Sequence, residues 1–333
     1  MRAVRIDGPG ALAVVDIADP EPGAGEVVVD VAYAGICGSD VEVADGTRPA
    51  DYVRYPVVPG HEWSGVVRTV GAGVDAALIG RKVVAEGFHA CGECADCRAG
   101  DPTLCAAGYD ETGFTRPGAW AEQVLVPAAL LHPLADSADL RSAAGIEPAA
   151  CSAAAVVQAD VRLGDRVAVV GGGTLGLLAV QLLLPAVDGE LLLIEPDARR
   201  RALAESWGAS VVHPDAAAAH HASFDVVIEA AGAPGTAAAA VDLARRGGRV
   251  VLTGIPATPD TIRVDAIVTK RLELESVFGA PRRAWAAAVA AFDAGILDPA
   301  ALVTHELDLA DAADALALVR AAAPATGKIL LRP

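Results

Sequence analysis

Four cysteines lie close together in the chain, at a spacing that suits a bound metal ion. Two residues separate each of the first three and seven precede the last: Cys91, Cys94, Cys97 and Cys105. Four thiolates complete the tetrahedral coordination that zinc prefers, and a closed site of this kind leaves no position for a substrate. The pattern predicts a structural zinc ion in a lobe at about residues 88–108. The alternative is a set of free or disulfide-bonded cysteines.

Other potential metal ligands are scattered through the first half of the chain. Cys37 stands in the segment Gly-Ile-Cys-Gly-Ser-Asp, His61 is followed by Glu62, and Glu147 precedes a proline. A lone histidine is more often structural than a ligand, so none of these residues identifies a site by itself. Together they offer a thiolate, an imidazole and carboxylates, a set that is typical of an open catalytic zinc site.

An open zinc site can activate a bound hydroxyl group. Zinc acts as a Lewis acid that lowers the pKa of a bound hydroxyl group, and the alkoxide can then release a hydride. Ser39 is placed to pass the hydroxyl proton outward, and Asp40 is a candidate partner that fixes the tautomer of His61.

A buried apolar run, Val-Ala-Val-Val, leads directly into a glycine-rich turn with the spacing GxGxxG. Gly171 permits the tight turn, Gly173 lets the backbone approach a pyrophosphate, and Gly176 lets the next helix pack against the strand. Thr174 and Leu175 complete the turn, where the free N–H groups of the helix point at phosphates. The alternative is a purely structural turn, because GxGxxG alone is weak evidence.

The next apolar run, Leu-Leu-Leu-Ile, ends in Glu195, about 20 residues after the glycines. A carboxylate there can hold the hydroxyls of the adenosine ribose and repels a 2′-phosphate, which favours NAD over NADP. Arg199 and Arg200 lie nearby, and Arg200 is a further candidate cofactor contact. Either arginine could instead attract the phosphate, so NADP stays as the second choice.

The pattern of the chain changes near residue 148. Before it, short runs of alternating β-branched residues stand between glycines and prolines, as in a β-rich domain. After it, apolar strand patterns alternate with Ala- and Leu-rich helical patterns, one of which is TAAAAVDLARRGG (236–248), and this alternation predicts a parallel sheet covered on both faces. Later segments predict helices at 281–295 and 310–323 and a short terminal strand. The fold class is therefore α/β, with domain boundaries near 147/148 and 277/278.

Composition excludes several classes of protein. A net charge of −17 disfavours a nucleic-acid binder, which needs a basic face, and an anionic membrane surface is an unsuitable partner for the same reason. No apolar run reaches the ~20 residues that span a bilayer, and the N-terminus lacks the apolar core of a secretion signal. We therefore expect a cytoplasmic protein, in which disulfides are rare.

The motifs and their order resemble the zinc-containing medium-chain dehydrogenase/reductase family over essentially the whole chain. The segments that carry the resemblance are GICGSD (35–40), GHEWSGVV (60–67), the four-cysteine loop, IEPAA (146–150), GGGTLG (171–176) and LLLIE (191–195). The family implies a GroES-like catalytic domain made of residues 1–147 and 278–333, and a doubly wound Rossmann domain at 148–277. It also implies two zinc ions per chain, NAD, a small-molecule substrate, and a homodimer or homotetramer.

By this resemblance Cys37 and His61 are ligands of the catalytic zinc, and Glu62 and Glu147 are exchangeable acidic ligands. Glu147 replaces the cysteine of simple alcohol dehydrogenases and is similar to the sorbitol, threonine and glucose dehydrogenase branch. Many members carry a histidine two residues after Asp40, where this chain has Glu42. Either Glu42 passes the proton onward, or Ser39 hands it to cofactor hydroxyls and water.

Two further stretches refine the expected substrate. Residues 55–65 and 113–119 resemble dehydrogenases that oxidise a ring hydroxyl of an aminocyclitol to a ketone in aminoglycoside biosynthesis. The substrate expected is therefore a secondary alcohol on a polyol, a sugar or an aminocyclitol ring. The alternative substrates are sorbitol, threonine or glucose, and a simple alcohol or aldehyde. A further alternative is that the protein is a non-catalytic descendant of the family.

Overall fold

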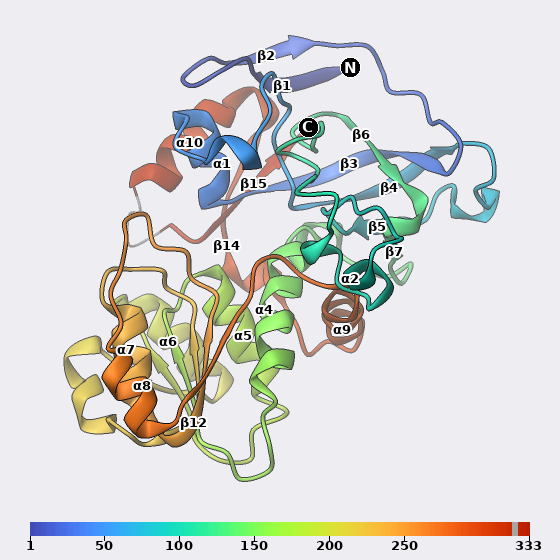
Figure 1. Cartoon of the computed structure of the whole chain (residues 1–333). Helices are drawn as coiled ribbons and strands as arrows, with labels where there is room; N and C mark the ends of the chain where they lie inside the picture. The colour runs from blue at the N-terminus through green and yellow to red at the C-terminus, as the bar shows by residue number, and fades with distance from the viewer. Residues whose placement is uncertain (322–325) are drawn as a thin grey trace. The chain divides into compact units, whose positions relative to one another are not determined.

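The computed structural model describes residues 1–321 and 326–333, which form two compact units. Unit 1 consists of residues 1–147, 281–293 and 299–333, and unit 2 of residues 148–280 and 294–298. Figure 1 follows the chain through both units, with the N-terminal strands in blue and the C-terminal strand in red. No helix in the described part of the chain is long and apolar enough to cross a bilayer.

Unit 1 is built on a mixed sheet. Its strands are β1 (Arg2–Ile6), β2 (Leu12–Asp16), β3 (Glu26–Ile36), β4 (Trp63–Val70), β5 (Lys82–Ala85), β6 (Gln123–Pro127), β7 (Leu131–Pro133), β14 (Val303–Asp308) and β15 (Lys328–Arg332). The order β14-β15-β3-β4-β5-β7 forms the main sheet, β6 also pairs with β3, and β1 and β2 form a separate hairpin. The β-branched run in β3 is fully buried at Val27 and Val29, which suits a strand with neighbours on both sides.

Short helices connect these strands. They are α1 (Gly38–Asp45), α2 (Ala95–Arg98), α3 (Leu140–Ala143), α9 (Arg282–Asp293) and α10 (Ala312–Ala321), with 3-10 turns η1 (Ala50–Tyr52), η2 (Ala76–Leu78), η3 (Pro102–Leu104), η4 (Ala128–Leu130), η6 (Pro299–Leu302) and η7 (Leu309–Asp311). Both helices expected near the C-terminus are present, as α9 and α10. The last residues of the second expected helix, 322–323, lie outside the described residues.

Unit 2 contains one parallel sheet. Its strands are β8 (Val167–Val170), β9 (Leu191–Ile194), β10 (Ser210–Val212), β11 (Phe224–Glu229), β12 (Ala244–Leu252) and β13 (Glu273–Ser276). The helical segments are α4 (Ile146–Ala159), which begins in unit 1, α5 (Thr174–Leu183), α6 (Ala198–Trp207), η5 (Pro214–His220), α7 (Thr236–Leu243) and α8 (Val264–Lys270). Figure 1 shows the strands lying among these helices.

The strand order of this sheet is β10-β9-β8-β11-β12-β13, and each neighbouring pair is parallel. The direction of the order reverses beside β8, which is the arrangement of a doubly wound nucleotide-binding fold. All residues of β8 and β9 are buried, as continuous apolar runs require when helices cover both faces. The predicted fold class is confirmed.

One predicted helix was too long. The Ala-rich pattern after Gly235 suggested a helix that continues through the arginines at 245 and 246. In the structure α7 ends at Leu243 and β12 begins at Ala244, opposite Phe224. The ammonium group of Lys270 donates to the carbonyls of Val241, Asp242 and Ala244 at 2.9–3.0 Å, which satisfies the end of the helix from a distant segment.

Candidate active site and cofactor site

The four cysteines meet in one loop. One sulfur of each, from Cys91, Cys94, Cys97 and Cys105, lies within 4.8 Å of the others, close enough to hold a metal ion. Backbone amides donate to these sulfurs at 3.3–3.4 Å, among them the amide of Cys91 to Cys105. Such donors stabilise thiolates, and hydrogen bonds from the backbone of Ala106 and Cys97 lower the pKa of Cys94 to about 6. Burial raises the pKa of Cys97, so a metal ion must displace its proton.

The residues expected at the second metal site also converge. Cys37, His61 and Glu62 bring one ligand atom each within 4.8 Å of one another, although 23 residues lie between the first two. Cys37 stands at the start of α1, where the backbone N–H of Cys37 donates to Asp40 Oδ2 at 2.8 Å. This capping box fixes the first turn of α1 and therefore the position of the Cys37 side chain.

Asp40 faces His61 from the same turn. The distance from Asp40 Oδ1 to His61 Nδ1 is 3.6 Å, which is long for a hydrogen bond, and neither atom has another partner among the described residues. Burial lowers the pKa of His61, but the charge of Asp40 and further contacts with Cys37 and Glu147 outweigh it and raise this pKa well above the usual value. Asp40 is thus placed to orient the imidazole.

A buried lysine holds Glu62. The ammonium group of Lys328, on β15, lies 2.7 and 2.8 Å from the two carboxylate oxygens of Glu62 and 3.2 Å from the carbonyl of Ile36. A glycine gives the carboxylate its space, because a Cβ at position 35 would lie 2.1 Å from Glu62 Oε2. No pattern in the sequence predicts this ion pair, because Lys328 and Glu62 are 266 positions apart in the chain.

Glu147 lies outside the group of three close ligands, in the first turn of α4. Burial raises its pKa to about 7, against the opposing effect of His61, and the charges of Glu62 and Glu111 raise it further. The charges of His61 and Glu62 therefore act on Glu147, which places its carboxylate close to this group of residues.

The two remaining residues of the expected proton path lie on α1. Ser39 is half-buried in the first turn of α1. Glu42 lies farther along the helix, where its side chain is 44% exposed and accepts a hydrogen bond from Arg48 at 3.4 Å. Glu42 is therefore tied to a cation, a contact that the sequence did not predict.

The glycine-rich turn has the shape that its spacing predicts. Gly171 has φ of +98°, and a Cβ there would lie 2.7 Å from Ala231. A Cβ at Gly176 would lie 1.8 Å from the carbonyl oxygen of Gly171, so the first turn of α5 requires glycine. No described atom lies within 4 Å of a Cβ built at Gly173, which leaves that side of the turn open. Thr174 is the first residue of α5 and Leu175 follows it.

The acidic residue after β9 is held by the backbone. Glu195 is buried, and its carboxylate oxygens accept hydrogen bonds from the N–H of Gly172 at 2.5 Å and of Asp197 at 2.7 Å. Asp197 in turn caps α6 by accepting from the N–H groups of Arg199 and Arg200. The carboxylate is thereby fixed next to the glycine turn, and both arginines begin the neighbouring helix.

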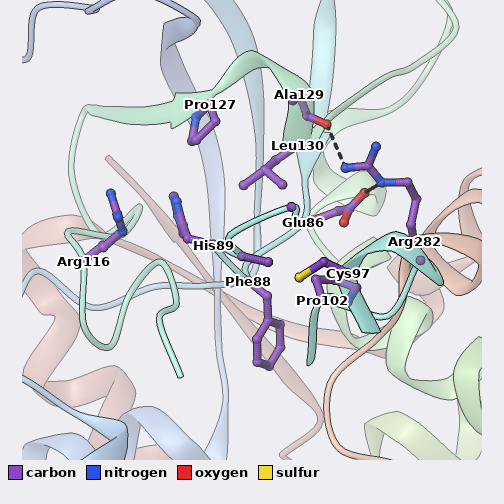
Figure 2. A pocket seen from close by; sticks show the side chains of 13 residues that line it. Glu86, Phe88, His89, Cys97, Pro102, Arg116, Pro127, Ala129, Leu130 and Arg282 are labelled. Atoms are coloured by element: carbon purple, nitrogen blue, oxygen red, sulfur yellow. Dashed lines mark hydrogen bonds and ion pairs between the residues drawn. The ribbon is translucent and has the colours of Figure 1, made fainter. Parts of the chain in front are cut away.

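A separate pocket of about 570 Å³ lies beside the four-cysteine loop. Figure 2 shows Glu86 and Arg282 on one side of it and His89 and Arg116 on the other. Glu86 pairs with Arg282 at 3.2 Å and with His132 at 3.1 Å. Neither Cys37 nor His61 lines this pocket, so it is not the expected catalytic site. Phe88 and His89 line this pocket, whereas Trp63 and Trp120 are buried in the core of unit 1.

A hydrogen-bonded group near His61 was not predicted from the sequence. The hydroxyl of Tyr109 donates to Glu111 Oε2, and Arg48 Nη2 donates to the same hydroxyl at 2.9 Å. Glu111 is 5% exposed, and its charge acts on that of Glu147. The only signal in the sequence was its place just before the stretch 113–119.

Comparisons with known proteins agree with this geometry. The family model described as an alcohol dehydrogenase GroES-like domain matches residues 23–136, and that of a zinc-binding dehydrogenase matches residues 174–294. A 2-dehydro-3-deoxy-L-galactonate 5-dehydrogenase of Pseudoalteromonas atlantica is 33% identical over 95% of this chain and 94% of its own length. Sorbitol and L-threonine dehydrogenases are among the other relatives.

Solved structures are similar over the full length. The RspB alcohol dehydrogenase of Escherichia coli, in complex with NADH, has a TM-score of 0.92 and 29% identity, covering 100% of this chain and 99% of that one. A zinc-binding dehydrogenase of Sinorhizobium meliloti bound to NADP has a TM-score of 0.91 and 31% identity with the same coverage. The motifs, the fold and these relatives establish that the chain belongs to the zinc-containing medium-chain alcohol and polyol dehydrogenases, which act on CH–OH groups.

Proposed function

We propose that this enzyme oxidises a secondary ring hydroxyl of a polyhydroxylated, amine-bearing substrate to a ketone, with NAD as the hydride acceptor. The best candidate is an aminocyclitol, as in 2-deoxy-scyllo-inosamine dehydrogenase of aminoglycoside biosynthesis. The observation that carries the proposal is the number of buried acids around the Cys37 and His61 pair. Asp40, Glu62 and Glu111 are all buried there, and the charges of Glu62 and Glu111 raise the pKa of Glu147.

The donor set fits a zinc ion. Cys37, His61 and Glu62 offer a thiolate, an imidazole and a carboxylate within reach of one another, and Glu147 is a candidate fourth ligand. Zinc bound there would supply a Lewis acid that lowers the pKa of the substrate hydroxyl. The close four-cysteine loop suits a second, structural ion.

The side chains around these ligands have separate tasks in this scheme. Asp40 keeps the imidazole of His61 oriented through its Nδ1 side. Lys328 holds the carboxylate of Glu62 and limits its movement between positions. Ser39, at the start of α1, accepts the hydroxyl proton and passes it to solvent or to cofactor hydroxyls.

The charge of the site favours the class of substrate. Buried carboxylates attract an ammonium group and accept hydrogen bonds from several hydroxyls, and they repel a carboxylate. This supports an amine-bearing cyclitol or a neutral polyol over the sugar acid in the name of the Pseudoalteromonas relative. Sorbitol is an open alternative, and threonine, which carries both charges, is another.

NAD is the proposed cofactor because Glu195 stands beside the glycine turn. A carboxylate at this place accepts hydrogen bonds from ribose hydroxyls and repels the 2′-phosphate of NADP. The NADP-bound Sinorhizobium structure makes NADP the alternative to be measured. Substitution of Glu195 by glutamine is expected to lower the ratio of kcat/KM with NAD to kcat/KM with NADP.

The deciding experiment measures NADH and NADPH formation with the zinc-loaded protein and a panel of substrates. The panel holds aminocyclitols, inositols, hexitols, aldoses, threonine and simple secondary alcohols. Turnover of an aminocyclitol with NAD supports the whole proposal, whereas turnover of only a hexitol or threonine discards the aminocyclitol. Exclusive activity on simple alcohols contradicts it.

Glu147→Ala separates catalysis from folding. The variant is expected to lose at least about 100-fold in kcat/KM, as is usual for a group beside the reacting atoms, while its melting temperature changes little. A loss of stability that matches the loss of activity contradicts a role at the metal.

A homodimer or homotetramer and a cytoplasmic location stay predictions, which light scattering and cell fractionation test.

A further inference from the structure

Glu111 is a buried carboxylate to which the proposed chemistry assigns no specific partner. Its turn packs directly against the segment that carries His61. The centroid of the Phe114 ring lies 4.6 Å from that of the His61 imidazole. A Cβ at Gly113 would lie 3.0 Å from the backbone nitrogen of His61. The two segments are therefore fixed relative to one another, and Glu111 occupies a defined place beside the metal ligands.

The charges of this region act on Glu111 from several sides. Burial raises the pKa of Glu111, the charge of His61 lowers it, and that of Asp40 raises it. In the part of the chain that the structure describes, no lysine or arginine forms an ion pair with Glu111. A buried carboxylate without such a partner is costly, and proteins keep one mainly where a ligand compensates it.

Two residues hold this carboxylate from one side only. The hydroxyl of Tyr109 donates to Glu111 Oε2, and Arg48 donates to that hydroxyl. Arg48 itself is fixed, because its guanidinium carbon lies 3.9 Å from the centroid of the Phe114 ring and its Nε donates to the carbonyl of Tyr52 at 2.9 Å. The guanidinium of Arg48 therefore forms no ion pair with Glu111, although its charge lowers the pKa of this carboxyl from nearby.

The other oxygen faces a position without a side chain. A Cβ at Gly87 would lie 3.0 Å from Glu111 Oε1, which is closer than an ordinary contact. The backbone of Gly87 therefore packs closely against this oxygen, and a side chain would not fit there. No described residue donates a hydrogen bond to Oε1, which leaves it as the acceptor that a ligand approaching from another direction can use.

We propose that Glu111 binds a hydrogen-bond donor of the substrate, by preference an ammonium group next to the reacting carbon, and that Tyr109 and Arg48 position it. The identity of the amine rests on the proposed function. The role of Glu111 as an acceptor does not, since a hydroxyl neighbouring the reacting carbon would use the same oxygen.

The test compares two substrates that differ in one group. scyllo-Inosamine carries an ammonium where scyllo-inositol carries a hydroxyl, and 2-butanol has neither. Glu111→Gln removes the charge but keeps an acceptor oxygen. We expect it to lower the ratio of kcat/KM for the amine over the inositol at least about tenfold, the equivalent of 1.4 kcal/mol. Its kcat/KM for 2-butanol should fall by a smaller factor than its kcat/KM for the amine, because 2-butanol offers Glu111 no neighbouring donor.

Glu86→Gln is the matched control. Glu86 is a second buried carboxylate in the same unit, but it belongs to the separate pocket and already pairs with Arg282. It is expected to leave the ratio unchanged. Tyr109→Phe is expected to lower the ratio partly, with an unchanged zinc content, because Glu111 then loses the donor that orients it. An equal loss of activity by Glu111→Gln on all three substrates, or a loss of zinc, would overturn the proposal.

Failure of the aminocyclitol assignment can be told apart from failure of this inference. If the wild type oxidises neither cyclitol, the pair becomes 2,3-butanediol and 2-butanol, which differ by one neighbouring hydroxyl. Glu111→Ala, which removes the acceptor, is then expected to lower the diol-to-alcohol ratio at least about fivefold, a change of about 1 kcal/mol as for one hydrogen bond. An unchanged ratio overturns the role of Glu111.

If neither alcohol is oxidised, binding of scyllo-inosamine to the zinc- and NADH-loaded protein is measured by calorimetry. Binding that Glu111→Gln weakens supports the role, and binding that is absent or unaffected overturns it.

Discussion

The ammonium group of Lys328 meets both carboxylate oxygens of Glu62, at 2.7 and 2.8 Å, across a separation of 266 residues in the sequence. Both side chains are almost completely buried. A potential zinc ligand is therefore held by a charge from the opposite end of the chain. The pair matters less for what it adds to stability than for what its loss leaves behind, a buried and unpaired charge.

Removal of that charge is expected to destabilise the fold. Lys328→Met should lower the free energy of unfolding by about 3 kcal/mol, because Glu62 would remain charged and buried. Lys328→Arg keeps the charge and serves as the control, which should retain most of the stability. Urea unfolding of the two zinc-loaded variants measures the difference. Equal stability of Lys328→Met and the wild type would refute the importance of the pair.

Gly35 is expected to tolerate no side chain. Its Cβ would lie 2.1 Å from Glu62 Oε2, and Glu62 cannot retreat without leaving Lys328. Gly35→Ala should therefore lower kcat/KM at least about 100-fold, since a displacement of about 1 Å at a catalytic group has costs of this size. Gly8→Ala, where the added carbon meets nothing within 4 Å, should behave as the wild type. An active Gly35→Ala enzyme would show that Glu62 need not stay where it is.

The four-cysteine loop is expected to stabilise unit 1 through its metal. Cys94→Ser should remove one zinc ion per chain and lower the melting temperature by roughly 5–10 °C, as a loss of a few kcal/mol does in a chain of this size. Metal analysis and calorimetry check both effects. Cys151→Ser, a change outside the loop, should keep both zinc ions. Full zinc content in Cys94→Ser would rule out the closed site.

His89 gives the stability of the fold a dependence on pH. Burial and the charge of Arg116 lower its pKa to about 4, whereas a histidine in the unfolded chain titrates near 6.5. Between these values the unfolded state binds the extra proton, so stability falls as the pH decreases from about 6.5 to 4. The loss attributable to this one group is about 2 kcal/mol at about pH 5.

The contribution of His89 appears as a difference between two stability curves. His89→Gln cannot take up the proton, so its free energy of unfolding should fall less than that of the wild type between about pH 7 and 5. Denaturant unfolding at each pH gives both curves. Parallel curves for the two proteins would contradict a half-buried, neutral His89.

What the sequence predicted well depends on local chemistry. The four cysteines and the glycine turn each lie within one short segment, so their spacing, read with the strand and helix patterns that flank the turn, predicts the bound group. The βαβ pattern likewise follows from the alternation of apolar strands with Ala-rich helices, and the observed strand order confirms it. The length of α7 was predicted wrongly because Lys270, a distant residue, terminates it.

The contacts that the sequence did not predict are long-range ones. Lys328 reaches Glu62 only because β15 pairs with β3, and no local pattern encodes that pairing. The same holds for the hydrogen bond from Arg48 to Tyr109 and for the approach of Glu111 to the segment of His61. A charged residue looks the same in a sequence whether it becomes solvated or buried, and only packing decides which occurs.

The position of β15 also determines the order in which the protein can be made. β15 lies between β3 and β14 in the sheet of unit 1, and it carries the cation that Glu62 requires. A ribosome therefore completes all of unit 2 before it supplies the strand that finishes unit 1. Until then the edge of β3 and the carboxylate of Glu62 await their partners. β3 is thus among the last strands to reach its final pairing, and a chain released before β15 would lack both a strand of the main sheet and the cation beside Glu62.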